Sequence, residues 1–211
     1  MKLMRTSRIR SSNCLVFFLS LLQLLLTVGC VTETNKTADV DKWLQCTPYM
    51  NPDAWGELSR PREAFDKWKT QGRELDSVER ILLLKLSKED DEKKLDRIII
   101  GLAAVGREKS IRPLLLVLRT KSFGLRYRAG WALGEIGDIA AVEPLCDIVR
   151  NGDELARSNA CLTLGALGGK MAKEALISAL KDQSQSVRSF AEAGILLLQN
   201  NKENATRVGQ E

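Results

Sequence analysis

The 211-residue chain contains no histidine. This absence excludes Ser-His-Asp and Cys-His catalytic arrangements, imidazole general bases and zinc sites that use imidazole ligands. Aromatic residues are also scarce, at 5% of the chain. Apolar residues make up 44% and charged residues 28%, which is ordinary for a globular domain with a packed core. The composition therefore favours a folded domain and removes much of catalytic chemistry.

Positive charge is concentrated at the start of the chain. The net charge is +5 and the pI is near 9.0, but four cations and no acid precede residue 33. The run Cys14–Val28 that follows is mainly apolar, and its 15 residues would reach roughly 22 Å as a helix, short of the ~30 Å membrane core. A basic start and a short apolar run predict a secretory signal peptide over residues 1–29.

The apolar run ends in the residues Leu26-Thr27-Val28-Gly29-Cys30. This ending resembles the lipobox of bacterial lipoproteins, although Thr27 stands where that motif usually has leucine. The resemblance implies cleavage after Gly29, lipidation of Cys30 with palmitate-type acyl chains, and stable anchoring to a membrane. Because the residue after Cys30 is valine rather than aspartate, it also implies the outer membrane of a two-membrane cell envelope. An ordinary signal peptide with a chance cysteine and an uncleaved anchor remain the alternatives.

Loss of the signal peptide would leave a chain of almost balanced charge. It removes four of the 32 cations and none of the 27 acids, so 28 cations remain. A near-neutral exported chain argues against nucleic-acid binding, which depends on cations that neutralise phosphates. We therefore expect no nucleic-acid partner.

Residues 30–60 are predicted to form the lipidated N-terminus, a flexible tether and an irregular cap. The stretch 31–41 is rich in polar residues and has no apolar period, as in a disordered linker. The stretch 43–56 contains two prolines and three aromatic residues, which favours a cap packed over the first helix. A ligand-binding loop is the alternative for that stretch.

From residue 61 the sequence repeats itself every 31 residues. The columns with this spacing include Leu102, Leu133 and Leu164; Gly106, Gly137 and Gly168; Leu114, Leu145 and Leu176; Arg126, Arg157 and Arg188. A fixed period of this length is the signature of stacked repeats. The predicted units are 92–122, 123–153 and 154–184, with a degenerate unit at 61–91, a partial unit at 185–200 and a polar C-terminal tail at 201–211.

Each unit is predicted to form two short helices. In the middle unit the apolar positions of 126–136 lie on one helix face, and Gly137 supplies a left-handed turn. Asp138 then caps a second helix that ends at Gly152. Helices of about 12 residues cannot bury their apolar stripes in isolated pairs, so neighbouring units must stack. An irregular helical bundle is the alternative.

The segments Leu125–Asp138 and Ala156–Gly169 are similar to the HEAT-like repeats first described in phycobilisome lyases. Both have an arginine, an alanine three residues later, a Leu-Gly pair and a final glycine. The resemblance covers residues 92–198 strongly and 61–91 weakly. It implies an all-α fold, a right-handed α-solenoid of helix pairs. It implies little about function, because unrelated sites occur on such frames.

Enzymes that share the repeat supply the alternative function. A lyase-type enzyme needs a nucleophile or an acid–base pair, for which Cys161 with Glu135 or Asp138 are the candidates. A relative that hydroxylates a modified lysine holds two irons through His-Glu pairs, which the absence of histidine excludes here. No Cys-x-x-Cys or metal-ligand spacing occurs, and we expect no enzyme activity, no metal and no cofactor. Cys146 and Cys161 flank apolar stripes, which favours buried thiols, while a disulfide between them remains open.

Two rows of polar residues on the second helices are the candidate partner-binding surface. The resemblance places second helices on the concave face, where the first row is Arg112, Glu143, Asp147, Glu174 and Ser178. With three acids against one arginine, this row suits a basic patch on a protein partner. A solvated helix face is the alternative.

The second row is Arg119, Arg150 and Lys181, which are 31 residues apart near the ends of second helices. Cations there offset the helix dipole, which is the favoured interpretation. A ladder that meets an acidic partner or anionic headgroups is the alternative. The arginine column that begins at Arg126 is predicted instead to tie adjacent units together.

These patterns predict a membrane-anchored lipoprotein that acts as a non-enzymatic scaffold or adaptor and binds a protein partner through its repeat surface. A lyase-type enzyme or chromophore-handling protein is the alternative. A structural envelope protein without a dedicated ligand is a third possibility.

Overall fold

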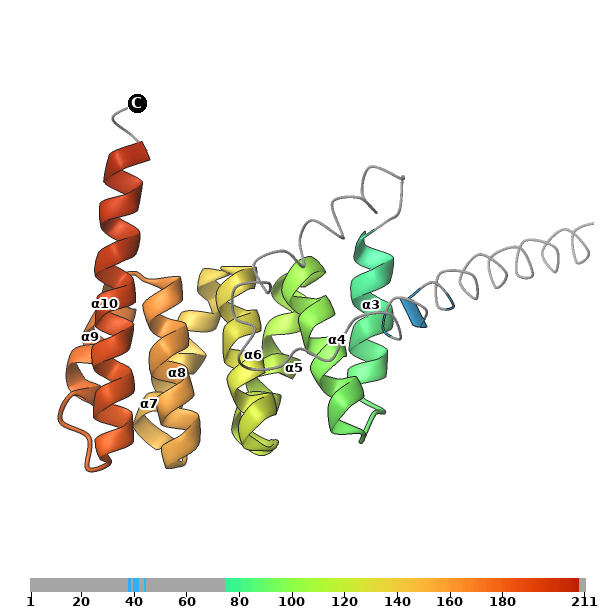
Figure 1. Ribbon diagram of the computed structural model, residues 1–211, viewed down its shortest axis with the longest axis horizontal. Helices are drawn as coiled ribbons and strands as arrows, with labels where there is room; N and C mark the ends of the chain where they lie inside the picture. Colours follow the sequence, from blue (N-terminus) through green and yellow to red (C-terminus); the bar gives the residue numbers. More distant parts are fainter. Residues whose placement is uncertain (1–37, 39, 42–43, 45–74, 209–211) are drawn as a thin grey trace, which may run out of the picture.

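The computed structural model describes residues 38, 40–41, 44 and 75–208 (Figure 1). All regular structure in this part of the chain is helical, and it contains no strand. The elements are α3 (Leu75–Leu86), α4 (Glu92–Val105), α5 (Glu108–Thr120), α6 (Phe123–Ile136), η1 (Ile139–Ala141), α7 (Val142–Asn151), α8 (Glu154–Leu167), α9 (Lys170–Ala179) and α10 (Gln185–Val208). The predicted signal peptide, Gly29 and Cys30 lie outside the described residues, as does most of the predicted cap.

The helices form two layers along the array. In one layer α4, α6, α8 and α10 pack side by side, and α5, α7 and α9 form the other (Figure 1). Second-layer helices pack against a first-layer helix of the following unit, as α5 does against α6 and α7 against α8. First-layer helices begin at residues 92, 123, 154 and 185, the starts of the predicted units. This stack of helix pairs is an α-solenoid, which confirms the predicted fold.

Glycine and aspartate set the helix boundaries. Gly137 ends α6 with a φ of 69°, the left-handed conformation predicted for it. Asp153 begins α8 by accepting a hydrogen bond from the backbone N–H of Ala156 at 2.8 Å. Asp138 accepts from the N–H of Ala140 at 2.9 Å and so caps η1 rather than α7. The prediction that Asp138 caps the second helix of its unit is therefore wrong, because a short 3₁₀ turn separates Asp138 from α7.

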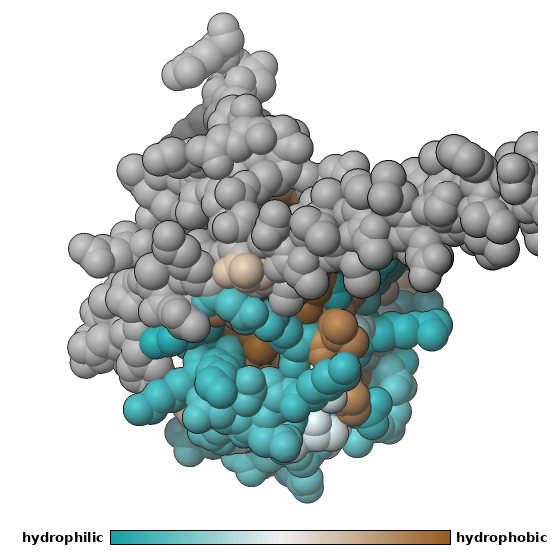
Figure 2. All heavy atoms as spheres, turned by 90° about the vertical axis from the view of Figure 1, so that its right-hand side faces the viewer, coloured by the Kyte–Doolittle hydropathy of each residue, from teal (hydrophilic) through white to brown (hydrophobic). Residues whose placement is uncertain are grey.

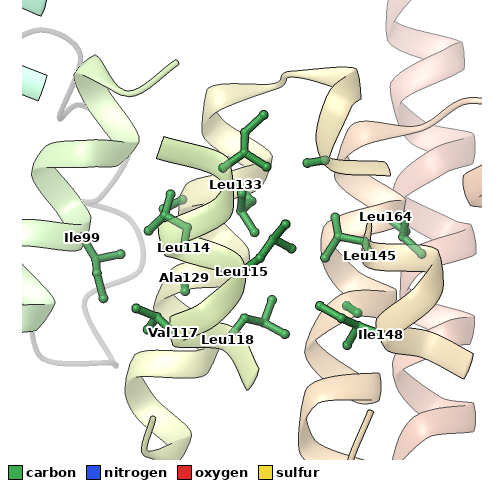
Figure 3. Packing of buried hydrophobic residues seen from close by; sticks show 14 of the residues in the cluster. Ile99, Leu114, Leu115, Val117, Leu118, Ala129, Leu133, Leu145, Ile148 and Leu164 are labelled. Carbon is green, nitrogen blue, oxygen red and sulfur yellow. The ribbon is translucent and has the colours of Figure 1, made fainter. Parts of the chain in front are cut away.

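The repeated leucines fill the space between the two layers (Figure 3). Leu133 and Leu164 of the first layer and Leu114 and Leu145 of the second are each no more than 1% exposed. Burial of one such side chain contributes about 1.5–3 kcal/mol relative to leaving it exposed. The leucine columns of period 31 are therefore part of the hydrophobic core of the solenoid.

The helices α8 and α10 approach each other too closely for side chains at the crossing. Gly165 of α8 lies against the backbone of Gly194 in α10. A Cβ added to Gly194 would lie 2.6 Å from the carbonyl oxygen of Cys161. Glycine at both positions therefore lets the two backbones touch.

Arginine–aspartate pairs connect successive first-layer helices. Arg157 donates to both carboxylate oxygens of Asp182 at 2.8 and 2.9 Å, and Arg126 donates to Asp153 at 2.7 Å. These hydrogen bonds hold the pKa of both carboxyl groups below the usual range. Both acids lie at the start of the next first-layer helix or in the loop before it, so these pairs tie adjacent units as predicted. Arg188 differs, because it donates to backbone carbonyls of the loop before its own helix.

Residues ahead of α3 cover the N-terminal end of the array. Val40 is 1% exposed in the core, and Asp41 pairs with Lys85 of α3 at 2.5 Å. The carbonyl oxygen of Leu44 accepts a hydrogen bond from Arg97 of α4 at 2.9 Å. Figure 2 views this end, where hydrophilic side chains surround a smaller group of apolar ones. These contacts correct the prediction of a flexible tether at Val40 and Asp41, since a valine in that polar stretch reaches the core.

The last helix, α10, continues to Val208 and projects beyond the other helices (Figure 1). The segment predicted as a polar tail therefore begins as an extension of the partial unit. Within the described residues, no helix combines the length and the apolar character that crossing a membrane requires.

Candidate functional site

All eight residues predicted to bind a partner belong to the second layer or the loop that follows it. Each of them is exposed. They are Arg112 and Arg119 on α5, Glu143, Asp147 and Arg150 on α7, Glu174 and Ser178 on α9, and Lys181 directly after α9. The structure thus places both predicted rows on one layer, where a partner could contact them together.

A hollow of about 610 Å³ opens between α7 and α9. Its polar rim consists of Arg150, Glu174, Ser178, Lys181 and Asp182. Its apolar lining consists of Cys146, Val149, Met171, Ala175 and Ala179. We call this feature the α7–α9 hollow. It brings together four of the eight predicted residues, whereas the α5 residues and the acids of α7 lie outside it.

Alanine at two repeat positions makes room for the α7–α9 hollow. Ala179 stands in the column that holds Val117 and Ile148 in the two preceding units. Ala175 stands in a column that holds proline in both of those units. The apolar lining was not predicted from the sequence. The smaller side chains at these two repeat positions are the signal that could have indicated it.

The predicted acidic row carries less free negative charge than its composition suggests. Asp147 lies 3.6 Å from Arg150 on the same helix, and Glu174 lies 4.0 Å from Lys170 on α9. Such exposed pairs contribute little stability, but each places a cation beside an acid. A basic patch on a partner would therefore meet two carboxylates that already have a positive neighbour, and Glu143, which forms no ion pair in the described part of the chain.

The cationic row keeps more of its charge. Arg119 and Arg150 lie in the last turns of α5 and α7, where they face the negative end of the helix dipole as predicted. In the described part of the chain, Arg119 and Lys181 form no ion pair and no side-chain hydrogen bond. The neighbouring Asp182 is held by Arg157 at 2.8 Å instead. Within the described residues, two of the three cations therefore have no ion pair, against one of the three acids of the other row.

The two described cysteines are free thiols in buried positions, so the disulfide that the sequence left open is not formed. Cys161 is 0% exposed, and burial, with a smaller contribution from the charge of Asp182, raises its thiol pKa to about 12. Burial also raises the pKa of Cys146. Because the thiolate is the nucleophile, neither group is prepared for covalent chemistry near neutral pH.

The structure does not assemble the residues proposed for a lyase-type site. Cys161 is 0% exposed and its backbone lies at the α8–α10 contact, while the carboxylate of Asp138 caps η1. Glu135 lines a separate hollow on the first layer. Among the described residues, no group of three or more Cys, Asp or Glu side chains is arranged to hold a metal ion.

That separate hollow, of about 400 Å³, lies between α6, α8 and α10. Tyr127, Trp131 and Leu197 belong to its lining. Trp131 also packs against the core, and the guanidinium of Arg128 lies 5.9 Å from its ring centroid. The indole therefore already has a cation partner within the protein, which makes this hollow the weaker candidate.

Residues 80–155 match the family described as HEAT repeats, which confirms the resemblance of the repeat units. The structure of human deoxyhypusine hydroxylase in complex with glycerol is similar, with a TM-score of 0.51 and 22% sequence identity. The similarity covers 61% of this chain and 44% of that one, so this chain spans less than half of its length. At this identity the likeness concerns the fold alone. A search of the curated proteins found no match.

Proposed function

We propose that this chain is a non-enzymatic scaffold or adaptor that binds a protein partner through its second layer. The α7–α9 hollow carries this proposal, because it combines an apolar lining with a charged rim on the layer where all eight predicted residues are exposed. Solenoids generally use such extended surfaces to bind other proteins. HEAT repeats over residues 80–155 support the same kind of function.

The chemistry of the buried groups favours a scaffold over a lyase-type enzyme. Covalent catalysis by Cys161 would require an accessible thiolate, but the thiol is 0% exposed with a pKa of about 12. The absence of histidine removes the commonest base that could activate it.

We further propose that lipid at Cys30, after cleavage behind Gly29, anchors the chain in the cell envelope, at the outer membrane if the cell has two membranes. Val40, ten residues later, is packed into the core of the array. Ten residues span at most about 35 Å, so the N-terminal end of the solenoid would stay close to the bilayer. The helices at that end, α3 and α4, would then lie near the membrane.

Metabolic labelling tests the anchor. Cells that express the chain with labelled palmitate should yield a labelled protein, and Cys30→Ala should abolish the label while the chain is still made. Cys46→Ala is the matched control and should keep the label. Incorporation that survives Cys30→Ala would contradict the anchor.

Site-specific photo-cross-linking in cells tests the binding surface. A cross-linking amino acid with a small aliphatic diazirine side chain, placed at Ser178 on the exposed rim of the hollow, should give a discrete adduct with a partner. The same amino acid at Glu192, which is exposed on α10 in the other layer, is the control and should give little or none. Adducts from Glu192 alone, or equal adducts from both, would place the partner elsewhere.

A further inference from the structure

We infer that the α7–α9 hollow takes an acidic, extended peptide segment of the partner, with one apolar side chain in the hollow and carboxylates on Arg150 and Lys181. This inference rests on the proposed function and names the chemistry of the partner. Three features carry it: the shape of the hollow, the charge of its rim, and the spacing of the cations along the second layer.

The hollow has room for an apolar side chain from outside the protein. Ala179 replaces the larger Val117 and Ile148 of the other units, and the space that this leaves is open to solvent. Met171, 52% exposed, contributes apolar surface that water now covers. Burying apolar surface there against a leucine-sized group would favour binding at about 25 cal/mol per Å².

The charge of the rim selects an acidic rather than a basic segment. Lys181 has no acid bonded to it in the described part of the chain, because Asp182 pairs with Arg157 at 2.8 Å. Arg150 lies 3.6 Å from Asp147, and the exposed acid on the rim, Glu174, lies 4.0 Å from Lys170. A carboxylate brought to this edge would therefore meet two exposed cations, and the basic patch predicted from the acidic row is the poorer fit.

The spacing of the cations predicts a pattern in the segment. Arg119, Arg150 and Lys181 occupy the same position in successive units. Packed helices lie roughly 8–10 Å apart, whereas an extended chain rises about 3.3 Å per residue. An acidic residue at every third position would therefore meet each cation in turn. A flat anionic bilayer could meet the cations as well, but it offers no side chain for the hollow.

Fluorescence anisotropy with the purified full-length chain tests the inference. The probe is a labelled nine-residue peptide with glutamates at its first, fourth and seventh positions and a leucine at its fifth. It should bind at least about tenfold more tightly than the same peptide with lysines in place of the glutamates. Replacement of the leucine by serine should weaken binding several-fold, because the hollow would stay unfilled.

Matched variants separate the site from general electrostatics. The double variant Arg150→Glu with Lys181→Glu should weaken binding of the glutamate peptide at least about tenfold. Lys173→Glu makes one charge reversal of the same kind at an exposed position of α9 outside the hollow and should leave binding within about twofold. Ser178→Trp, at an exposed rim position, should remove the preference for leucine over serine. Circular dichroism confirms that each variant is folded.

Several results would overturn the inference. These are tighter binding of the lysine peptide, no binding of the glutamate peptide, or equal weakening by Lys173→Glu and the double variant. Vesicles of phosphatidylglycerol that bind the chain through Arg150 and Lys181, while the peptide does not, would assign the cations to a membrane surface. If peptide binding fails while cross-linking from Ser178 persists, the scaffold function stands and the acidic partner is wrong. Loss of that cross-link would instead count against the proposed function.

Discussion

The two layers of the solenoid meet their neighbours in different ways. In the first layer, α8 and α10 touch at Gly165 and Gly194, and the hydroxyls of Ser158 and Ser186 lie 3.3 Å apart. In the second layer, α7 and α9 leave a hollow of about 610 Å³ beside the exposed Met171. Small residues thus have opposite effects, since glycine lets backbones close up in one layer and alanine leaves space in the other. Both layers contribute to the core, but the closest helix contact lies in the first layer, and the second is the layer proposed to bind.

The largest effect is expected where the first layer is tightest. Gly165→Ala places a Cβ against the backbone of Gly194 and should lower the free energy of unfolding by about 3 kcal/mol. Gly124→Ala in α6 is the matched control, because its Cβ meets nothing within 4 Å, and it should be neutral or raise stability by up to about 1 kcal/mol. Urea unfolding measures both. Equal stabilities of the two variants would contradict the close approach.

The next effect separates a buried pair from an exposed one. Asp182→Ala leaves Arg157, whose side chain is 11% exposed, without its carboxylate and should cost about 2–3 kcal/mol of unfolding free energy. Asp147→Ala removes the exposed pair with Arg150 on the second layer and should stay within about 0.5 kcal/mol. A similar cost for both variants would show that the layers do not differ in this respect.

Acid should destabilise the first layer through its aspartates. The guanidinium of Arg157 lowers the pKa of Asp182, and that of Arg126 lowers the pKa of Asp153. Their stabilisation is thus fully present above the unfolded pKa of about 3.9 and is lost as the pH falls through the lower folded values. The urea concentration at the unfolding midpoint should decrease as the pH drops below about 4. Asp182→Asn should make this decrease smaller. An unchanged acid dependence in Asp182→Asn would exclude this carboxyl group as a cause.

The smallest expected effect concerns the two buried thiols. The thiol of Cys161 is 0% exposed and has a pKa of about 12, whereas Cys146 forms part of the lining of the hollow. Alkylation of the folded chain at pH 8 should be slow at both, because burial raises both pKa values, and slowest at Cys161. Mass spectrometry of the two peptides gives the order. Faster labelling of Cys161 would mean that the first layer opens more readily than the second.

The fold followed from the sequence because its determinants are local and repeated. The left-handed turn at Gly137 and the leucine columns fix where helices end and which face they bury. Two details of the structure differed from the prediction. Asp138 accepts a hydrogen bond from the N–H of Ala140 and so begins a 3₁₀ turn. Val40 is buried in the core, although the residues around it in the sequence are polar. The continuation of α10 past residue 200 is consistent with residues 201–208, which contain no glycine or proline.

The candidate site was predicted only in part. The columns placed Arg150 and Lys181 on one edge, because a fixed period puts equivalent residues in equivalent places. The sign of the charge on this surface was harder to predict, because it depends on which charged side chains lie beside each other. The pairing of Asp147 with Arg150 has the i, i+3 spacing that a helix brings together, so it was available in the sequence. The hollow itself depends on side-chain volume across two helices, which no single column determines.

The central claim is that the second layer binds while the first layer stabilises. Ser178→Trp tests it most directly, because it fills the rim of the α7–α9 hollow at an exposed position. Affinity for the cross-linked partner and free energy of unfolding would be measured on the same preparation. We predict at least about a tenfold loss of affinity with a change in stability within about 0.5 kcal/mol. Unchanged affinity, or a loss that appears only together with lost stability, would contradict the claim.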